Sequence, residues 1–523
     1  MVEGKGKVYL VGAGPGDVGL LTLRGKDCLA EADVVVYDRL INPELLHFTR
    51  EDCEKIYVGK APGQHALSQE EINNLLIRLA REGKKVVRLK GGDPFLFGRG
   101  GEEALALKEA GIPFEIVPGV TSAVAVPAYA GIPVTHRGLA STVAMVTGNE
   151  DPGKEGSRIN WRELARSADT LVFLMGVGNL SHIVGQLLLH GRSPSTPVAL
   201  IRWGSRAEQE TLVGTLLDIE AKAQAASFRN PAVIVVGEVV RLREKLAWWD
   251  NKPLAGRRIV ITRPWPQGER MAKKLSELGA EILQFPAIKI SPPADLKALD
   301  RLVREAPSFD WIIFTSVNGV DWFWRRLKAQ GLDVRSLAKV KIAAIGPATS
   351  QALAERGILV DYQPAEYIAE AVASGLGPQV KGKRILLPRA DIARPVLAEE
   401  LRRWGAEVVE VAAYKTGKAD GEASMLQEWL SQGRIDAITF TSASTVRFFL
   451  EILGIRAVEL LKQTVVACLG PVTSSAAQEA GLEVIIEARE YTEEGLIQAL
   501  VEYFTGRTKP EKKPEVDSGE LHD

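Results

Sequence analysis

The chain has 523 residues with a formal net charge of −1, and its 46% hydrophobic and 25% charged content is that of an ordinary soluble globular protein. Single hydrophobic cores stop growing near roughly 250–300 residues, so this length predicts several domains. The near-neutral charge argues against a nucleic-acid partner, and the absence of a long apolar run argues against a membrane partner.

Cysteine and histidine usage bounds the chemistry further. The three cysteines, Cys28, Cys53 and Cys468, are far apart and odd in number, and the six histidines show no ligand spacing. These patterns predict neither a disulfide framework nor a metal site. Because Met1–Lys5 lacks the apolar stretch of a signal peptide, we expect a cytoplasmic protein.

The N-terminal half opens with an expected strand and the glycine-rich loop 11–17, Val-Gly-Ala-Gly-Pro-Gly-Asp. A dinucleotide-binding loop needs a third glycine where Asp17 stands, and Pro15 removes a backbone donor of the kind that cradles pyrophosphate. A second expected strand, Lys85–Leu89, leads into another glycine loop at 91–93, which has no place in a dinucleotide fold. Both loops argue against an NAD-dependent dehydrogenase, the alternative enzyme class for this half.

Apolar runs alternate with helical patterns along the whole chain, which predicts an α/β fold in both halves. A buried strand is expected over Val233–Val240 and another over Arg258–Thr262, with a linker between the halves at 246–256. The last residues, 508–523, are rich in Lys, Pro and Glu and are expected to be a disordered tail.

The C-terminal half contains an internal duplication. Short blocks recur in one order: 259–264 at 385–390, 278–281 at 404–407, 314–316 at 440–442, 345–349 at 469–473, and 366–367 at 490–491. A period this long excludes a solenoid repeat. It predicts two similar α/β lobes with a ligand cleft between them.

The two glycine loops, with the motifs at 34–40, 57–60, 97–103, 117–123 and 129–137, give residues 5–245 a resemblance to the uroporphyrinogen-III C-methyltransferases. The resemblance implies a two-subdomain tetrapyrrole methylase fold and S-adenosylmethionine as cofactor. It implies methylation of uroporphyrinogen III at carbons 2 and 7 to precorrin-2, the entry to siroheme and cobalamin. It places cofactor contacts at Pro15, Gly91, Gly92, Asp93, Leu96, Thr121, Ser122, Met175 and Gly204.

The same resemblance assigns Asp38 as proton acceptor and Lys60 as proton donor. Methylating a pyrrole carbon leaves a cation that must lose a proton, so a nearby base is chemically reasonable. The alternatives are that Asp38 pairs with Arg39 at a strand end and that Lys60 contacts a substrate carboxylate. Asp93 as a helix cap and Met175 as core packing are also open. Candidate partners for the substrate's carboxylates are Arg39, Arg99, His136 and Arg137.

Residues 257–505 resemble the uroporphyrinogen-III synthases on the repeated blocks and on Tyr414-Lys415-Thr416. The resemblance implies closure of hydroxymethylbilane to uroporphyrinogen III with inversion of ring D and no cofactor. It also implies that the chain starts in one lobe, builds the second and returns. Lobe one is then expected at 256–289 plus 416–507, and lobe two at 290–415.

Hydroxyl side chains of the repeated loops are expected at the carboxyl ends of strands, where helix N-termini favour anionic ligands. N-capping of those helices is the alternative. Tyr414 matches the tyrosine proposed to assist loss of the bilane hydroxyl, with interlobe packing as its alternative. The predicted substrate contacts are Arg263, Thr315, Ser316, Asn318, Thr349, Arg389, Thr441, Ser442, Ser444 and Thr473, with Lys415 as a further carboxylate candidate.

The product of the second half is the substrate of the first, so the sequence predicts a bifunctional enzyme that uses no metal. Direct channelling between the halves is a hypothesis, and a homodimer through the methyltransferase half is expected. The dehydrogenase-chelatase segment of three-function siroheme synthases is not expected here. The alternative is that the first half methylates another acceptor while the second is a non-catalytic two-lobed ligand sensor.

Overall fold

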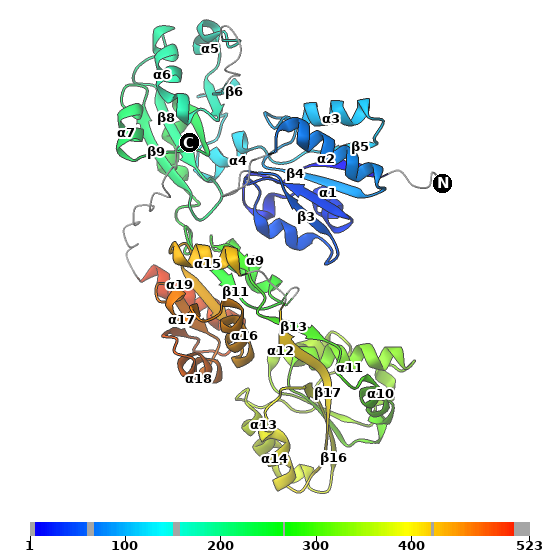
Figure 1. The fold of residues 1–523 in the computed structure, drawn as a ribbon. Coiled ribbons are helices and arrows are strands. Elements are labelled where there is room, and N and C mark those ends of the chain that lie inside the picture. Colours follow the sequence, from blue (N-terminus) through cyan, green and yellow to red (C-terminus); the bar gives the residue numbers. More distant parts are fainter. Residues whose placement is uncertain (1–5, 60–66, 150–156, 265–266, 420–422, 507–523) are drawn as a thin grey trace. The chain divides into compact units, whose positions relative to one another are not determined.

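The computed structural model describes residues 6–59, 67–149, 157–264, 267–419 and 423–506 (Figure 1). They form two compact units, the first from the described residues of Met1–Ile259, Ala272–Leu283 and Phe504–Pro510, and the second from those of Val260–Met271 and Gln284–Tyr503. No helix of these ranges is long and apolar enough to cross a membrane. The predicted tail at 508–523 lies outside the described residues.

The first sheet is entirely parallel, with strand order β3-β2-β4-β1-β5. Its strands are β1 (Lys7–Gly12), β2 (Val34–Tyr37), β3 (Glu54–Tyr57), β4 (Lys85–Lys90) and β5 (Phe114–Val117), and its helices are α1 (Leu23–Ala30), α2 (Gln69–Arg81) and α3 (Gly100–Glu109). Leu10 packs toward α2 and α3, while Leu89 packs toward α1, so both faces are covered. The predicted strand Lys85–Leu89 is confirmed, and all the loops that follow the strands lie at one edge.

The second sheet is mixed, with order β6-β7-β10-β8-β9. Its elements are β6 (Val143–Thr147), β7 (Thr170–Leu174), β8 (Pro197–Arg202), β9 (Glu210–Thr215), β10 (Ala232–Val236), α4 (Ser122–Tyr129), α5 (Trp161–Ser167), α6 (Leu180–Leu189), α7 (Ile219–Ala225) and α8 (Arg243–Leu246). The strand predicted over Val233–Val240 is too long. Gly237, at φ +147°, ends the strand, and Glu238–Leu242 forms a 3-10 turn instead.

The segment predicted as a linker, 246–256, is packed within the first unit. Trp249 and Leu254 are buried, and the indole nitrogen of Trp248 donates to the carbonyl of Ala128 at 2.9 Å. The ring of Tyr129 lies 4.8 Å from that of Trp249. Burial of the apolar side chains of Trp249 and Leu254 anchors this segment to the first unit.

Two further sheets carry the duplicated sequence, in the orders β12-β11-β18-β19-β20 and β13-β17-β16-β14-β15. The first contains β11 (Arg258–Ile261), β12 (Glu281–Gln284), β18 (Ala437–Phe440), β19 (Val465–Cys468) and β20 (Val484–Glu487). The second contains β13 (Ile288–Ser291), β14 (Trp311–Phe314), β15 (Lys341–Ala344), β16 (Arg384–Ala390) and β17 (Glu407–Lys418). The chain therefore enters one sheet, builds the other, and returns to the first.

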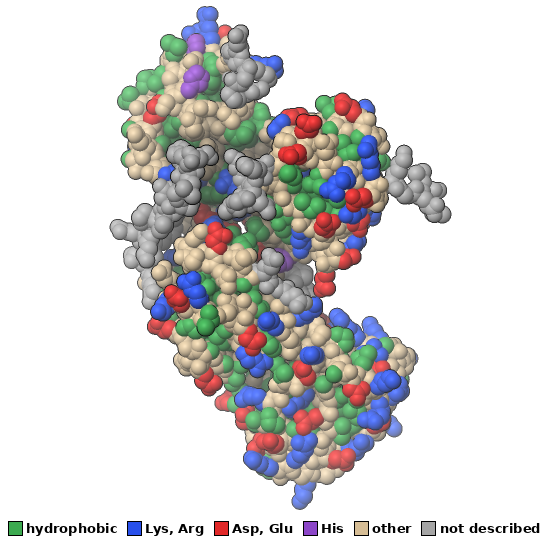
Figure 2. All heavy atoms as spheres, viewed as in Figure 1, with side chains coloured by type: hydrophobic (Ala, Val, Ile, Leu, Met, Phe, Trp, Pro, Cys, Tyr) green, Lys and Arg blue, Asp and Glu red, His purple; other side chains and the backbone are tan. Residues whose placement is uncertain are grey.

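The helices of this half are α9 (Glu269–Glu277), α10 (Leu296–Glu305), α11 (Val317–Ala329), α12 (Pro347–Ala354), α13 (Ala369–Leu376), α14 (Val396–Arg403), α15 (Ser424–Ser431), α16 (Ala443–Leu453), α17 (Ala457–Leu460), α18 (Pro471–Glu479) and α19 (Glu493–Thr505). Each sheet combines the two copies of the repeat, because β11 and β12 of the first copy lie with β18, β19 and β20 of the second, whereas β16 and β17 of the second copy lie with β14 and β15 of the first. The series β14, α11, β15, α12 matches β18, α16, β19, α18, and the two strands of each copy are parallel neighbours. On the face drawn in Figure 2, acidic and basic side chains of the described residues are interspersed.

Candidate active sites

The two glycine loops of the N-terminal half lie side by side. The amide of Gly92 donates to the carbonyl of Gly14 at 2.8 Å, and the amide of Gly14 donates back at 3.2 Å. Gly92 has φ +68°, a left-handed conformation that favours glycine. A Cβ built on it would find only backbone atoms of Ser122 and Thr121 nearby, at 3.7 and 3.9 Å. The loops thus meet next to two further residues predicted to contact the cofactor.

A third loop, which follows β5 and contains Gly119, packs against these two loops. A Cβ at Gly12 would lie 2.5 Å from the Cα of Gly119, so neither position has room for a side chain. One carboxylate oxygen of Asp93 accepts from the amides of Phe95 and Leu96, at 2.8 and 3.1 Å, and the other accepts from Gly119 at 3.0 Å. The carboxylate of Asp93 therefore joins the second loop to the third.

Strained backbone conformations, with positive φ at non-glycine residues, are concentrated in the loops that follow β4, β7 and β8. Of the non-glycine residues described with positive φ, all but Ser227 lie in these loops: Phe97, Arg99, Met175, Trp203 and Ser205. Strain of this kind is typical of functional sites. Met175 is 45% exposed, which does not fit the alternative that it packs in the core. A Cβ at Gly204 would lie 2.5 Å from Val126, so α4 fits closely against this loop.

The remaining predicted cofactor residues surround the same loops. Thr121 caps α4 and accepts from the amide of Ala123 at 3.2 Å, and the partly exposed Ser122 is the first residue of that helix. Leu96 packs against the core below α4, and Pro15 is half-buried. Gly91 has the Cβ of Leu40 within 3.0 Å of the position its own Cβ would take.

Sequence reasoning missed the contacts that hold the first loop to the second subdomain. The hydroxyl of Tyr129 donates to Asp17 at 2.5 Å, and the amide of Asp17 donates to the hydroxyl of Ser205 at 3.0 Å. Burial and the Asp17 carboxylate together raise the pKa of Tyr129, so this hydroxyl stays protonated. The side chain of Asn42 also reaches this loop, donating to the carbonyl of Gly16 at 2.7 Å.

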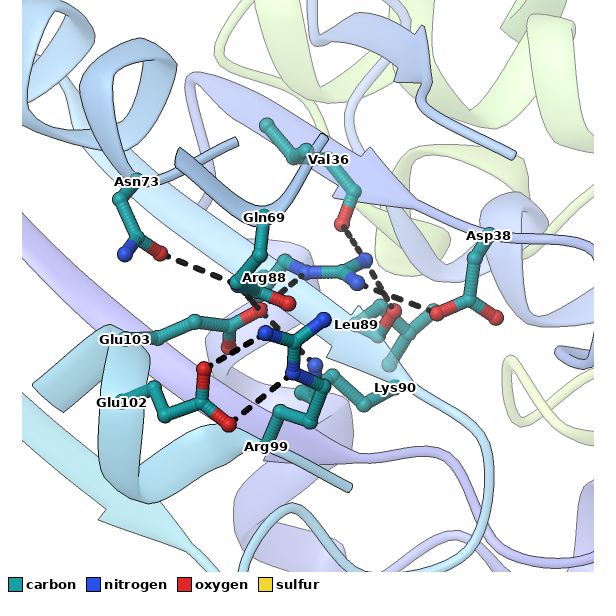
Figure 3. Close-up of polar contacts among 10 residues, drawn as sticks. All are labelled: Val36, Asp38, Gln69, Asn73, Arg88, Leu89, Lys90, Arg99, Glu102 and Glu103. Carbon is teal, nitrogen blue, oxygen red and sulfur yellow. Dashed lines mark hydrogen bonds and ion pairs between the residues drawn. The ribbon is translucent and has the colours of Figure 1, made fainter. Parts of the chain in front are cut away.

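Asp38 follows β2, and its carboxylate is paired with Arg88 (Figure 3). Nη2 of Arg88 lies 3.1 Å from Oδ2 of Asp38, and the amide of Leu40 donates to Oδ1 at 3.1 Å. The ion-pair partner of Asp38 is therefore Arg88 and not its chain neighbour Arg39, which is exposed. Lys60, the predicted proton donor, lies outside the described residues.

Behind Asp38 lies a buried charge cluster, which we define as Arg88, Lys90 and Glu103. Oε1 of Glu103 accepts hydrogen bonds from Nε of Arg88 at 3.2 Å and from Nζ of Lys90 at 2.8 Å. Burial, then the neighbouring Arg88, lowers the pKa of Lys90. The sequence analysis did not predict this cluster. It could have been inferred from two cationic residues on one face of an otherwise apolar strand, because buried Lys and Arg side chains almost always have an acidic partner.

The other basic candidates of this half are exposed. Arg99 pairs with Glu102 at 2.7 Å, while His136 and Arg137 lie in a turn closed by backbone hydrogen bonds between His136 and Ala140. The described residues contain no cluster of three or more His, Cys, Asp and Glu side chains placed to hold a metal ion.

In the C-terminal half, the structure brings Ser316, Asn318 and Tyr414 together. Ser316 caps α11 by accepting from the amide of Gly319 at 3.0 Å, and its hydroxyl lies 3.0 Å from that of Tyr414. Asn318 also accepts a hydrogen bond from Gln267. Burial raises the pKa of Tyr414, and hydrogen bonds from Ser316 and Asn318 offset part of that rise. Tyr414, on β17, belongs to a hydrophobic core that includes residues of β14 and α11, which supports a packing role as well.

The other hydroxyl candidates sit in first helical turns or just before them. Ser442 caps α16, and its hydroxyl lies 3.0 Å from that of Ser444. Thr349 and Thr473 lie in the first turns of α12 and α18 and are only 4% and 6% exposed. The partly exposed Thr315 and Thr441 directly precede the two capping serines.

Internal partners engage two of the predicted arginines, whereas Lys415 is exposed. Arg389 donates to the carbonyls of Ala393 and Arg394, each at 2.9 Å, and pairs with Glu410 at 3.1 Å. Arg263 forms an ion pair with Glu493. A substrate carboxylate would have to share these arginines with their present partners.

Comparison with known proteins identifies both halves. Residues 7–220 match the model of the tetrapyrrole (corrin/porphyrin) methylases, and residues 269–498 match that of uroporphyrinogen-III synthase HemD. The porphyrin biosynthesis protein HemD of Ruminiclostridium josui is 40% identical over 96% of this chain and 99% of its own length. The uroporphyrinogen-III C-methyltransferase of Bacillus subtilis (strain 168) is 46% identical over 69% of this chain and 74% of its own. A crystal structure of a Thermus thermophilus uroporphyrin-III C-methyl transferase with S-adenyl homocysteine is 45% identical over 45% of this chain and 100% of its own, with a TM-score of 0.40.

Proposed function

Because the chain belongs to the family of the porphyrin biosynthesis protein HemD and joins a uroporphyrinogen-III C-methyltransferase to a uroporphyrinogen-III synthase, we propose that it carries out two consecutive reactions. The C-terminal half closes hydroxymethylbilane to uroporphyrinogen III with inversion of ring D. The N-terminal half then methylates carbons 2 and 7 to give precorrin-2, toward siroheme or cobalamin. The observation that carries the proposal is the relative whose similarity runs through both halves.

The residues of the three glycine loops fit S-adenosylmethionine, which supplies an electrophilic methyl group when bound. A Cβ on Gly92 would have no side-chain atom within 4 Å and would face the first turn of α4, whose N-terminus offers backbone donors. Pro15, Gly91, Leu96, Met175 and Gly204 border the same loops in our proposal. We expect Asp93 to act mainly by fixing the loops, since both its oxygens already accept from backbone amides.

Asp38 is the proposed proton acceptor, and Lys60 remains the proposed donor. Asp38 is suited to the role because its carboxylate is held by Arg88 and the Leu40 amide while its side chain keeps 28% exposure. A fixed base near the reacting carbon removes the proton without first reorganising. Arg39, Arg99, His136 and Arg137 are exposed and are proposed to bind substrate carboxylates.

In the synthase half, Tyr414 is the proposed group that assists departure of the bilane hydroxyl. Burial keeps its hydroxyl protonated at neutral pH, so it can donate a hydrogen bond to a leaving oxygen. Ser316 and Asn318 orient that hydroxyl. The N-termini of α11, α12, α16 and α18 are proposed to receive substrate carboxylates, because exposed backbone amides and the helix dipole favour anions there.

A coupled assay tests both reactions. The purified chain receives fresh hydroxymethylbilane under anaerobic conditions, with and without S-adenosylmethionine, and products are resolved by isomer and mass. We expect type III uroporphyrinogen without the methyl donor and a dimethylated product with it. Only the type I isomer, which forms spontaneously, would show that the C-terminal half is not a working synthase. Type III product that stays unmethylated would refute the proposed acceptor of the N-terminal half.

We expect a homodimer formed through the methyltransferase half, and a monomer by light scattering at micromolar concentration would contradict this. Channelling is tested separately by adding a catalytically dead partner domain or an unfused pair of halves. An unchanged lag before methylated product would show that fusion gives proximity without directed transfer.

A further inference from the structure

The charge cluster behind Asp38 leads from the protein interior to the loop edge of the first sheet. Glu103 has a side-chain exposure of 0%, Arg88 of 4% and Lys90 of 7%, whereas Asp38 reaches 28%. Arg88 and Lys90 come from one face of β4, and Glu103 reaches them from α3 (Figure 3). Buried charges are strongly unfavourable unless they are paired, so this arrangement demands an explanation.

Glu103 is the point on which the buried donors converge. Its Oε1 atom accepts hydrogen bonds from Arg88, from Lys90 and from the side-chain amide of Gln69, the last at 3.2 Å. Its Oε2 atom is buried without a hydrogen-bond partner among the described residues. All of the directed interaction therefore acts through one oxygen, which fixes where the two cations lie.

The guanidinium of Arg88 is held on three sides before it meets Asp38. Nε donates to Glu103, and Nη1 donates to the carbonyls of Val36 and Leu89, at 3.4 and 3.2 Å. The remaining nitrogen, Nη2, is the one that binds Asp38. Because the guanidinium is planar, fixing Nε and Nη1 also fixes the direction in which Nη2 donates.

We propose that Glu103 is a positioning residue for methyl transfer, holding the Asp38 carboxylate in place through Arg88. The inference rests on the proposed function, since it presumes that Asp38 accepts the proton. Lys90 also pairs with Glu103, so that Arg88 is not the only cation that balances this carboxylate and stays available to Asp38. The side chain of Glu103 has no exposed surface, so it acts through Arg88 and not on the substrate.

The Glu103→Gln variant tests the proposal, with Glu109→Gln as a matched control on an exposed position of the same helix. We expect Glu103→Gln to lower kcat of methylation about tenfold, because a displaced catalytic group loses effective concentration. The KM for uroporphyrinogen III and the Kd for S-adenosylhomocysteine should stay unchanged. Glu109→Gln should change none of the three. A weaker Kd with unchanged kcat would overturn the proposal, because Glu103 would then only shape the cofactor loops.

A double-variant cycle with Asp38→Asn separates positioning from a purely structural role. If Glu103 acts through Asp38, adding Glu103→Gln to Asp38→Asn brings no further loss of kcat. Losses that multiply would overturn the inference and leave the role of Asp38 intact. A normal kcat in Asp38→Asn would instead refute the proposed proton acceptor, and the inference with it. If Glu103→Gln does not fold, Glu103→Asp enters the same cycle, because it keeps the charge but withdraws it from Arg88.

Discussion

The loop at Thr315-Ser316 and its repeat at Thr441-Ser442 open their helices in the same way but meet different neighbours. Ser316 has φ −165° and ψ 154°, and Ser442 has φ −160° and ψ 157°, so the two backbones are nearly identical. Each serine accepts a hydrogen bond from an amide three residues later. The hydroxyl of Ser316 also contacts Tyr414, whereas that of Ser442 contacts Ser444 and Thr445.

The third residue of each helix explains the difference in capping. The hydroxyl of Thr445 accepts a hydrogen bond from the amide of Ser442 at 3.3 Å, which completes a capping box. Gly319 stands at the matching place, where a Cβ would lie 2.9 Å from the carbonyl oxygen of Pro388 on β16. Duplication therefore kept the cap in both lobes, while the neighbouring strand in one lobe excluded the box. The two loops therefore share one cap geometry and differ in the groups that each capping serine contacts.

Tyr414→Phe should give the largest effect, because it removes the hydroxyl that only one lobe places beside its capping serine. We expect synthase kcat to fall about a hundredfold, the scale of losing a general acid. Thermal stability should fall by only about 1 kcal/mol, the net value of one hydrogen bond. The rate of type III product formation measures the first quantity, and methylation of supplied uroporphyrinogen III by the same variant is the internal control. A nearly normal synthase rate would assign Tyr414 to packing alone.

Gly319→Thr places at the start of α11 the residue that completes the capping box of α16. Overlap with the Pro388 carbonyl should destabilise the second unit by about 2 kcal/mol, the usual cost of overpacking. Denaturant unfolding followed by tryptophan fluorescence measures the change. Stabilisation would show that β16 yields at this point and that the box was lost for another reason.

Ser316→Ala and Ser442→Ala compare the caps directly. Each should lower the free energy of unfolding by about 1 kcal/mol, because each leaves a helix amide without its acceptor. Only Ser316→Ala should also slow the synthase and raise the pKa of Tyr414 further, since Ser316 holds that pKa down. Alkaline titration of tyrosinate absorbance, with Tyr414→Phe as reference, follows the second effect. Equal synthase rates in the two variants would show that the contact between Ser316 and Tyr414 does not distinguish the two loops in the reaction.

The smallest effects are expected at the repeated Gly-Pro loops. A Cβ at Gly470 would lie 2.9 Å from the ring of Tyr491, and one at Gly346 would lie 3.2 Å from Tyr367. Both glycines have extended backbones that any residue adopts. Because Tyr491 is 43% exposed and its ring can swing away, we expect Gly470→Ala to cost about 0.5 kcal/mol and Gly346→Ala less. A cost above about 2 kcal/mol at either site would show that the tyrosine is locked in place.

Sequence reasoning predicted the backbone of the methyltransferase site better than its side-chain contacts. The loops around Gly14 and Gly92 were found because a glycine needed for a left-handed turn or a close approach is visible in sequence. The partner of Asp38 was not, because Arg39 is adjacent in the chain whereas Arg88 lies fifty residues away on a neighbouring strand. The ion pairs of Arg263 and Arg389 were missed for the same reason, since their partners are distant along the chain or on another strand.

The sequence alone determined the α/β class, the duplication and the strand predicted over Lys85–Leu89, because these depend on local pattern and on residues near one another in the chain. It left open which hydroxyl side chains cap helices, and the structure assigns that role to Ser316 and Ser442. Only the tertiary structure decided which groups share a site. It brought Glu103 onto Arg88 and Lys90, Tyr129 onto Asp17, and Tyr414 onto Ser316. Strand order and helix packing determine these side-chain contacts. Both arise from the burial of apolar surface over the whole chain and not from any single segment.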